Sequence, residues 1–203
     1  NDFKANFKQV IHYSGLKRKG VSSGTIFFKK PNKVKWEQYK PEKSSYISNG
    51  KKMWLYMPED DQVFINKNLK EVVDKIGLLF LSQESKIYKN YSISLLKKEK
   101  IPLDKSSKKK KIKTKYTKKA LDTNITQKEA FFEFLPKNKD KFLKAIFKVN
   151  TSKFLISKVM LYDLARNKTV ISLSKIGFNL GVKDSFFEFK PPKNAEIYSS
   201  DSY

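Results

Sequence analysis

The segment KVKWEQYKPEKSSYISNGKKMWLYM, residues 33–57, decides how this chain is expected to fold. Short runs rich in Ile, Trp, Tyr and Val alternate in it with turn-forming residues, a pattern typical of neighbouring β-strands. The pair Asn49-Gly50 lies between two such runs, 44–48 and 51–57. Both central positions of a type I′ turn need a positive φ, which Asn and Gly tolerate best, so this pair predicts a tight antiparallel hairpin.

The same pattern continues on both sides of the hairpin. We expect strands at 21–29, 33–39, 44–48, 51–57, 62–66, 91–96, 130–135, 143–149, 155–163, 169–175 and 186–190. Most connections are too short for parallel crossovers, which need a dozen or more residues. The sequence therefore predicts a mainly β fold in which about eleven strands form an antiparallel meander, curved into a sheet or an unclosed barrel.

Two segments have the period of a helix instead. Residues 1–14 place four apolar side chains on one helical face before Gly15, a natural stop: Phe3, Phe7, Val10 and Ile11. Residues 68–83 carry a longer apolar stripe after Asn68, a suitable N-cap. We expect both helices to cover one face of the sheet.

Apolar side chains of both parities occur in 52–57, so these strands carry more apolar surface than one packed face uses. Two interpretations stay open from the segments alone. The surplus lines a cavity, or a highly curved sheet packs aromatic side chains on both of its sides.

Composition excludes most catalytic chemistry. The 203 residues include no cysteine and one histidine, His12, and no G-x-S-x-G motif is present. The longest apolar runs, such as 78–81, are far shorter than the roughly 20 residues of a membrane-spanning helix. We expect neither an enzyme nor a metal or cofactor site, and no membrane-spanning helix.

The charge of the chain is +24, and it is concentrated in one segment. Residues 97–119 hold twelve lysines against two acidic residues, including the run Lys108, Lys109, Lys110 and Lys111. Attraction to nucleic acid, to another polyanion or to anionic lipid is one interpretation, and a solvated loop is the other. Only Arg18 and Arg166 are arginines among 44 basic residues, whereas base reading and phosphate recognition favour the guanidinium.

Three stretches carry a resemblance to a known family. Residues 27–37, FFKKPNKVKWE, residues 47–58, ISNGKKMWLYMP, and Gln62-Val63 resemble the LolA family of periplasmic outer-membrane lipoprotein carriers. Phe3, Phe7 and Gln9 resemble the family's first helix, and 187–192 resemble its last strand. The resemblance covers nearly the whole chain, which implies one domain, 1–203. Residues 97–128 depart from it as a basic insertion.

The resemblance implies an unclosed β-barrel with a helical lid over a hydrophobic cavity that shields lipoprotein acyl chains. It also implies a periplasmic location, a LolCDE-type ABC transporter as donor and a LolB-like outer-membrane acceptor of the same fold. Absence of cysteine favours the soluble carrier over the lipid-anchored acceptor, and we expect a monomer. The basic insertion is expected to contact anionic membranes transiently or to act as a docking loop.

The expected cavity and lid residues are apolar and come from both helices and the first strands: Phe7, Ile11, Ile26, Phe28, Trp36, Trp54, Tyr56, Leu78, Leu79 and Leu81. Ordinary core packing is the alternative for each, because strand parity depends on register. Lys30 stands where the family carries an arginine that holds the lid closed, which implies a weaker gate, or else it is a surface lysine. Val34 corresponds to an apolar position at the cavity rim, where it contacts partners or simply packs.

Overall fold

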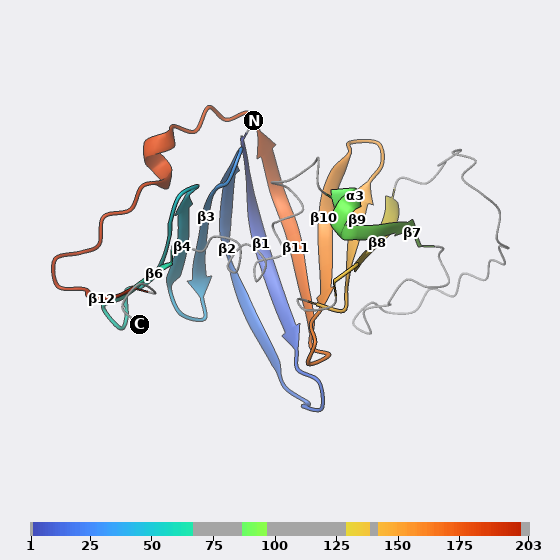
Figure 1. The fold of residues 1–203 in the computed structure, drawn as a ribbon, viewed down its shortest axis with the longest axis horizontal. Coiled ribbons are helices and arrows are strands. Elements are labelled where there is room, and N and C mark those ends of the chain that lie inside the picture. The colour runs from blue at the N-terminus through green and yellow to red at the C-terminus, as the bar shows by residue number, and fades with distance from the viewer. Residues whose placement is uncertain (1, 67–86, 97–128, 139–141, 200–203) are drawn as a thin grey trace, which may run out of the picture.

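The computed structural model describes residues 2–66, 87–96, 129–138 and 142–199. In these residues the chain forms one open, twisted sheet of twelve strands, ordered β12-β6-β5-β4-β3-β2-β1-β11-β10-β9-β8-β7 (Figure 1). Every neighbouring pair is antiparallel except β12 with β6. The sheet ends at β12 and β7, which do not pair with each other, so the predicted unclosed antiparallel sheet is confirmed.

The strands are β1 (Asp2–His12), β2 (Lys19–Lys29), β3 (Lys33–Lys40), β4 (Ser44–Asn49), β5 (Met53–Met57), β6 (Gln62–Asn66), β7 (Tyr91–Leu95), β8 (Glu129–Pro136), β9 (Lys144–Asn150), β10 (Leu155–Tyr162), β11 (Lys168–Phe178) and β12 (Glu196–Ser199). The helical elements of the described residues are two single turns, α3 (Ile87–Asn90) and the 3-10 helix η3 (Asp184–Phe187). Neither is long and apolar enough to cross a membrane.

The N-terminal segment is a strand, so the prediction of a helix over 1–14 was wrong. β1 pairs along its full length with β2, from Asp2 opposite Lys29 to His12 opposite Lys19, and it pairs with β11 on its other side. The alternation of Phe3 and Phe7 with Lys4 and Lys8 has the strand period of two, and two hydrogen-bonding neighbours decide in its favour.

The predicted hairpin at Asn49-Gly50 joins β4 to β5, with Ser48 opposite Met53. Of these two residues, Gly50 has a positive φ (91°) and Asn49 does not, so the predicted type I′ turn was wrong. The Asn49 side-chain oxygen instead accepts hydrogen bonds from the backbone N–H groups of Lys51 (2.9 Å) and Lys52 (3.1 Å). Asparagine therefore closes this longer turn through its side chain rather than through its backbone conformation.

The C-terminal region also differs from expectation. Residues 186–190 are not a strand, and the first two of them belong to η3. The segment crosses β3 and β4, which are internal strands with no free edge to pair with. The chain then returns to the sheet edge as β12, which adds to β6 in parallel. No helical lid is found in the described residues, and the expected helix over 68–83 and the basic insertion 97–128 lie outside them.

The register divides the side chains between two faces, because residues paired across neighbouring strands point to the same side of a sheet. We call one side the Phe7 face; it carries Phe3, Ala5 and Phe7 of β1, Ile26 and Phe28 of β2, and Val34 and Trp36 of β3. The other side is the Lys8 face; it carries Lys4, Asn6 and Lys8 of β1 with Thr25 and Phe27 of β2.

Gly24 in β2 is required by a close approach of two strands on the Phe7 face. A Cβ there would clash with the backbone carbonyl oxygen of Glu37 and would lie 2.8 Å from the ring of Phe7. We expect Gly24→Ala to lower the free energy of unfolding by about 1–3 kcal/mol, measured by urea denaturation. Gly177→Ala is the control, because its Cβ would make an ordinary 3.4 Å contact with Leu180. An equal loss in both variants would contradict the packing argument.

Candidate functional site

An apolar cluster occupies the Phe7 face at the centre of the sheet. It contains eight buried residues from β1, β2, β3 and β11: Phe3, Ala5, Phe7, Ile26, Phe28, Val34, Trp36 and Ile171. The rings of Phe7 and Trp36 lie 4.2 Å apart. Tyr46, Val159, Leu173 and Ile176 pack against the cluster and are only partly buried.

A second cluster continues the same face across β7–β10. Its buried members are Phe142, Ala145 and Phe147, and Tyr91, Phe134 and Leu161 pack against it while half-buried. Register places Val159 opposite Ile171 on one side and opposite Phe147 on the other, so Val159 belongs to the edges of both clusters. The Phe7 face is therefore one continuous apolar surface that crosses the sheet.

This surface retains half-buried aromatic and aliphatic side chains. Phe132 of β8 pairs with Leu95 on one side and Phe147 on the other, and its own ring is only partly buried. Leu95 is 52% exposed. Such a surface can bind apolar matter by removing it from water. No group of three or more His, Asp or Glu side chains able to hold a metal ion occurs in the described residues.

The structure brings five of the expected cavity residues to the Phe7 face. Phe7, Ile26, Phe28 and Trp36 are buried in the central cluster, and Ile11 is half-buried opposite Gly20 on the same side. Leu78, Leu79 and Leu81 lie outside the described residues, as do Lys108, Lys109, Lys110 and Lys111.

Trp54 and Tyr56 lie on the Lys8 face, the side of the sheet opposite to Phe7. Register pairs Trp54 with Ile47, and Ile47 with Lys35, so their parity is opposite to that of Trp36. Trp54 is 2% exposed and packs with Ile47 and Val63. The alternation in 52–57 therefore supplies both faces, and only the register decides which residue serves which.

The structure also gives the positions of Val34, the expected rim residue, and Lys30, the expected gate residue. Val34 is 6% exposed, opposite Phe28 and Ser48 in the central cluster. Lys30 is exposed in the turn between β2 and β3.

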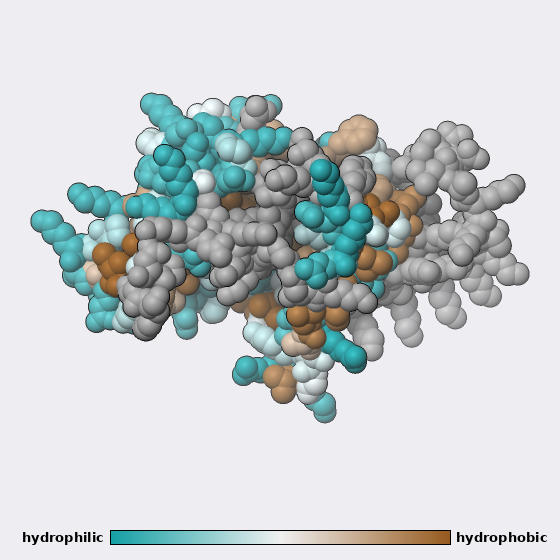
Figure 2. All heavy atoms as spheres, viewed as in Figure 1, coloured by the Kyte–Doolittle hydropathy of each residue, from teal (hydrophilic) through white to brown (hydrophobic). Residues whose placement is uncertain are grey.

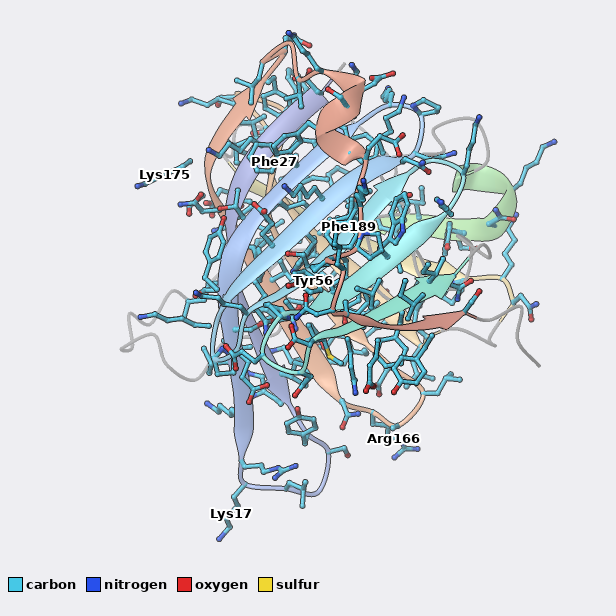
Figure 3. All side chains as sticks on the ribbon, turned by 90° about the vertical axis from the view of Figure 1, so that its left-hand side faces the viewer. Lys17, Phe27, Tyr56, Arg166, Lys175 and Phe189 are labelled. Atoms are coloured by element: carbon cyan, nitrogen blue, oxygen red, sulfur yellow. The ribbon has the colours of Figure 1, made fainter. Side chains whose placement is uncertain are left out.

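The Lys8 face over β2–β6 is covered by residues 179–195, which we call the strap. Phe189 of the strap lies over Tyr56, with ring centroids 5.3 Å apart, and 6.2 Å from Trp54 (Figure 3). Phe187 is fully buried, and Phe186 lies 4.8 Å from Phe27, edge to face. These aromatic side chains account for the apolar surface on this side of β3–β6.

Polar contacts fasten the strap to β1, β2 and β3. Lys29 donates to the carbonyl oxygen of Val182 (2.7 Å) and pairs with one carboxylate oxygen of Asp184 (2.6 Å); Lys33 pairs with the other (2.9 Å). The carboxylate of buried Asp2 accepts the N–H groups of Leu180 (2.6 Å) and Val182 (2.9 Å). Sequence reasoning missed these residues because the partners lie about 150 or more positions apart and no local pattern marks them.

The strap contacts shift two carboxyl groups in the same direction. Burial alone would raise the pKa of Asp2, but hydrogen bonds from Leu180 and Val182 and the charge of Lys29 outweigh it and lower that pKa below its ordinary 3.8. Hydrogen bonds from Lys29 and Lys33 lower the pKa of Asp184 in the same way. Both groups are therefore ionised at neutral pH and hold the strap as anions.

The chain is similar to known proteins both in sequence and in fold. A sequence profile described as LolA, outer membrane lipoprotein carrier protein LolA, matches residues 1–120. An outer-membrane lipoprotein carrier protein from Dechloromonas aromatica (strain RCB) is 24% identical over 194 residues, covering 96% of this chain and 79% of that protein. Another from Legionella pneumophila (strain Corby) is 25% identical over 195 residues, covering 95% and 81%. An uncharacterized conserved protein from Thermus thermophilus shares the fold, with TM-score 0.52 at 8% identity, covering 98% of this chain and 90% of that one.

The lowered pKa values predict how acid affects the strap. A group whose pKa is lower in the folded state stabilises that state above its unfolded pKa, and the contribution is lost as the pH falls through the folded value. We expect the Leu180 and Val182 N–H groups to keep their protection from hydrogen exchange from neutral pH down to the ordinary pKa of Asp2, 3.8, and to lose it as the pH falls further through the lowered pKa. Asp2→Asn should reduce this protection already at neutral pH, because the amide offers a single acceptor oxygen. Unchanged protection in the variant would contradict the role of Asp2.

Proposed function

The chain belongs to the LolA family of outer membrane lipoprotein carrier proteins, and from that premise we propose that it carries the acyl chains of lipoproteins on its Phe7 face. The family consists of carriers, and the continuous apolar surface from Phe3 to Phe147 supports this use. The strap already covers the Lys8 face over β2–β6, and the remaining apolar cluster of that face, buried Ile146, Met160 and Val170 over β9–β11, is smaller than the surface of the Phe7 face.

The energetics of acyl transfer require such a surface. Each CH₂ withdrawn from a bilayer into water costs about 0.8 kcal/mol, so two or three long chains cost tens of kcal/mol unless another apolar environment receives them. Half-buried side chains such as Phe132, Phe134 and Leu161 already expose part of their surface to solvent. Covering that surface with acyl chains removes both apolar partners from water.

Loading and delivery set opposite demands on the affinity. We propose that cargo enters from a LolCDE-type ABC transporter and leaves to a LolB-like outer-membrane acceptor, with this chain moving between them in the periplasm. The acceptor must then hold the acyl chains more tightly than the Phe7 face does, because a ligand moves only down its own free-energy difference. A loosely packed, partly exposed surface suits that requirement better than a closely fitted one.

The gate at Lys30 is part of this proposal. Lys29 and Lys33 flank the same turn and anchor the strap on the Lys8 face through Asp184, so lysines at this end of β2 and β3 already hold one covering segment. An ammonium is a compact, strongly hydrated charge, whereas a guanidinium presents five donors in a planar fork. Lysine at this position therefore holds a covering segment less firmly than arginine.

Binding of an acyl probe tests the assignment of the Phe7 face through adjacent phenylalanines of β8. Phe132 lies on the Phe7 face opposite Phe147, whereas Phe131 points to the Lys8 face opposite Lys148, and both rings are half-buried. We expect Phe132→Ser to weaken binding of a fluorescent fatty acid by about tenfold, since a Phe side chain loses roughly 1.5–3 kcal/mol of apolar burial.

Phe131→Ser is the matched control and should bind the probe like the natural protein. Native mass spectrometry of both variants for co-purified lipid gives a second measurement. Equal losses in the two variants would remove the assignment of the cargo to one face, and no probe binding by the natural protein would remove the carrier proposal itself.

The gate is tested separately with Lys30→Arg. We expect the arginine variant to bind an apolar fluorescent probe more slowly than the natural protein, at a similar final affinity, because it opens less readily. Stopped-flow association rates measure this. Identical association rates in the two proteins would contradict the gating role of Lys30 without affecting the assignment of the cargo to the Phe7 face.

A further inference from the structure

The two arginines of the chain lie in two turns at the same end of the sheet. Arg18 belongs to the turn between β1 and β2, and Arg166 to the turn between β10 and β11. His12 of β1 pairs with Lys168 of β11 at the end of their ladder, so both turns lie at the same end of the strands. Figure 1 shows these turns side by side at its lower end, and Figure 3 labels Lys17 and Arg166 there.

Hydrogen bonds join the two turns into one unit, which we call the tip (residues 13–19 and 163–168). The backbone N–H of Ser14 donates to the side-chain oxygen of Asn167 (2.8 Å). Asn167 is itself held by Asp163, whose two carboxylate oxygens accept its backbone and side-chain N–H groups, each at 2.8 Å. These hydrogen bonds hold the two turns together, and they use both carboxylate oxygens of Asp163.

The tip combines exposed apolar side chains with a high positive charge. Leu16 is 56% exposed and Leu164 is 50% exposed. Against the single carboxylate of Asp163 the tip carries five basic residues: Lys17, Arg18, Lys19, Arg166 and Lys168. Figure 2 shows hydrophobic and hydrophilic side chains mixed at this protruding end.

Tyr13 supports Arg18 from the base of the tip. The guanidinium carbon of Arg18 lies 5.3 Å from the centroid of the Tyr13 ring, a cation–π arrangement that keeps the donors of the guanidinium free for an outside anion. Tyrosine is itself enriched where proteins meet the membrane–water interface.

This combination selects one class of partner. A nucleic acid would use the cations but would leave Leu16 and Leu164 in water, and an apolar protein groove would leave the cations without partners. At the surface of an anionic bilayer, lipid phosphates can pair with the cations, and the nearby boundary between headgroups and acyl chains can receive the leucines. We propose that the tip docks on the surface of an anionic phospholipid bilayer, with Arg18 and Arg166 on lipid phosphates and Leu16 and Leu164 among the headgroups.

This docking surface is separate from the Phe7 face and does not depend on cargo. The guanidinium fork recognises phosphate more specifically than an ammonium, which gives a reason for arginine at these two positions in a chain otherwise rich in lysine. Docking at the tip would bring the carrier to a membrane while leaving the Phe7 face unoccupied.

Vesicle flotation of the full chain tests the proposal. We expect binding to vesicles of phosphatidylcholine with about 30% phosphatidylglycerol and little binding to pure phosphatidylcholine, with a strong decrease at high salt. The double variants Leu16→Ser with Leu164→Ser, and Arg18→Gln with Arg166→Gln, should each lower the partition coefficient by about tenfold. Arg18→Lys with Arg166→Lys should bind between the natural protein and the glutamine variant.

Matched controls lie at the opposite end of the sheet. Leu180 is 50% exposed, the same as Leu164, and Lys175 and Lys183 are exposed as well. Leu180→Ser, and Lys175→Gln with Lys183→Gln, should leave the partition coefficient within about twofold of the natural protein. Thermal unfolding of every variant checks that the sheet is intact.

Two outcomes overturn the proposal. If the tip variants float like the natural protein, or the controls lose as much binding as the tip variants, the tip is not the docking site. If the leucine variants keep full binding and only charge matters, with equal losses on double-stranded DNA and on vesicles, the tip is a general polyanion site rather than a membrane contact. Acyl-probe binding by the same variants stays unchanged in either case, which separates this inference from the carrier function.

Discussion

The pairing of β1 with β2 on one side and β11 on the other is the interaction on which the rest of the structure depends. Strands β2–β6 and β7–β11 are each a run of neighbours in the chain, and only β1 joins the two runs into one sheet. Its continuous register with β2 also sets the parity of every strand beyond it. A shift of one residue there would exchange the Phe7 and Lys8 faces on one half of the molecule.

The sheet carries apolar residues on both sides, and the two sides are packed differently. The strap covers the Lys8 face over β2–β6 with Phe186, Phe187 and Phe189, and it is fastened by Lys29, Lys33 and Asp2. The Phe7 face keeps half-buried side chains across the whole sheet.

Prediction from sequence worked best where a segment and its partner are neighbours in the chain. The strands from 21 to 66 and the hairpin at Asn49-Gly50 are confirmed, because their contacts are local. It failed for β1, where the spacing of Phe3, Phe7 and Ile11 fits a helix as well as a strand until two neighbouring strands supply the hydrogen bonds. It failed again at 186–190, where a run of phenylalanines serves a strap rather than a strand.

The amino-acid sequence by itself determined the meander of strands, the excess of apolar side chains, the absence of cysteine and the family to which the chain belongs. Each of these is a local or additive property of the residues. Only the tertiary structure decided that Trp36 and Trp54 lie on opposite faces and that Asp2 holds residues near 180. It also decided that the turns carrying Arg18 and Arg166 are joined at one end of the sheet. These depend on strand register and on contacts between distant parts of the chain, which no local pattern of residues encodes.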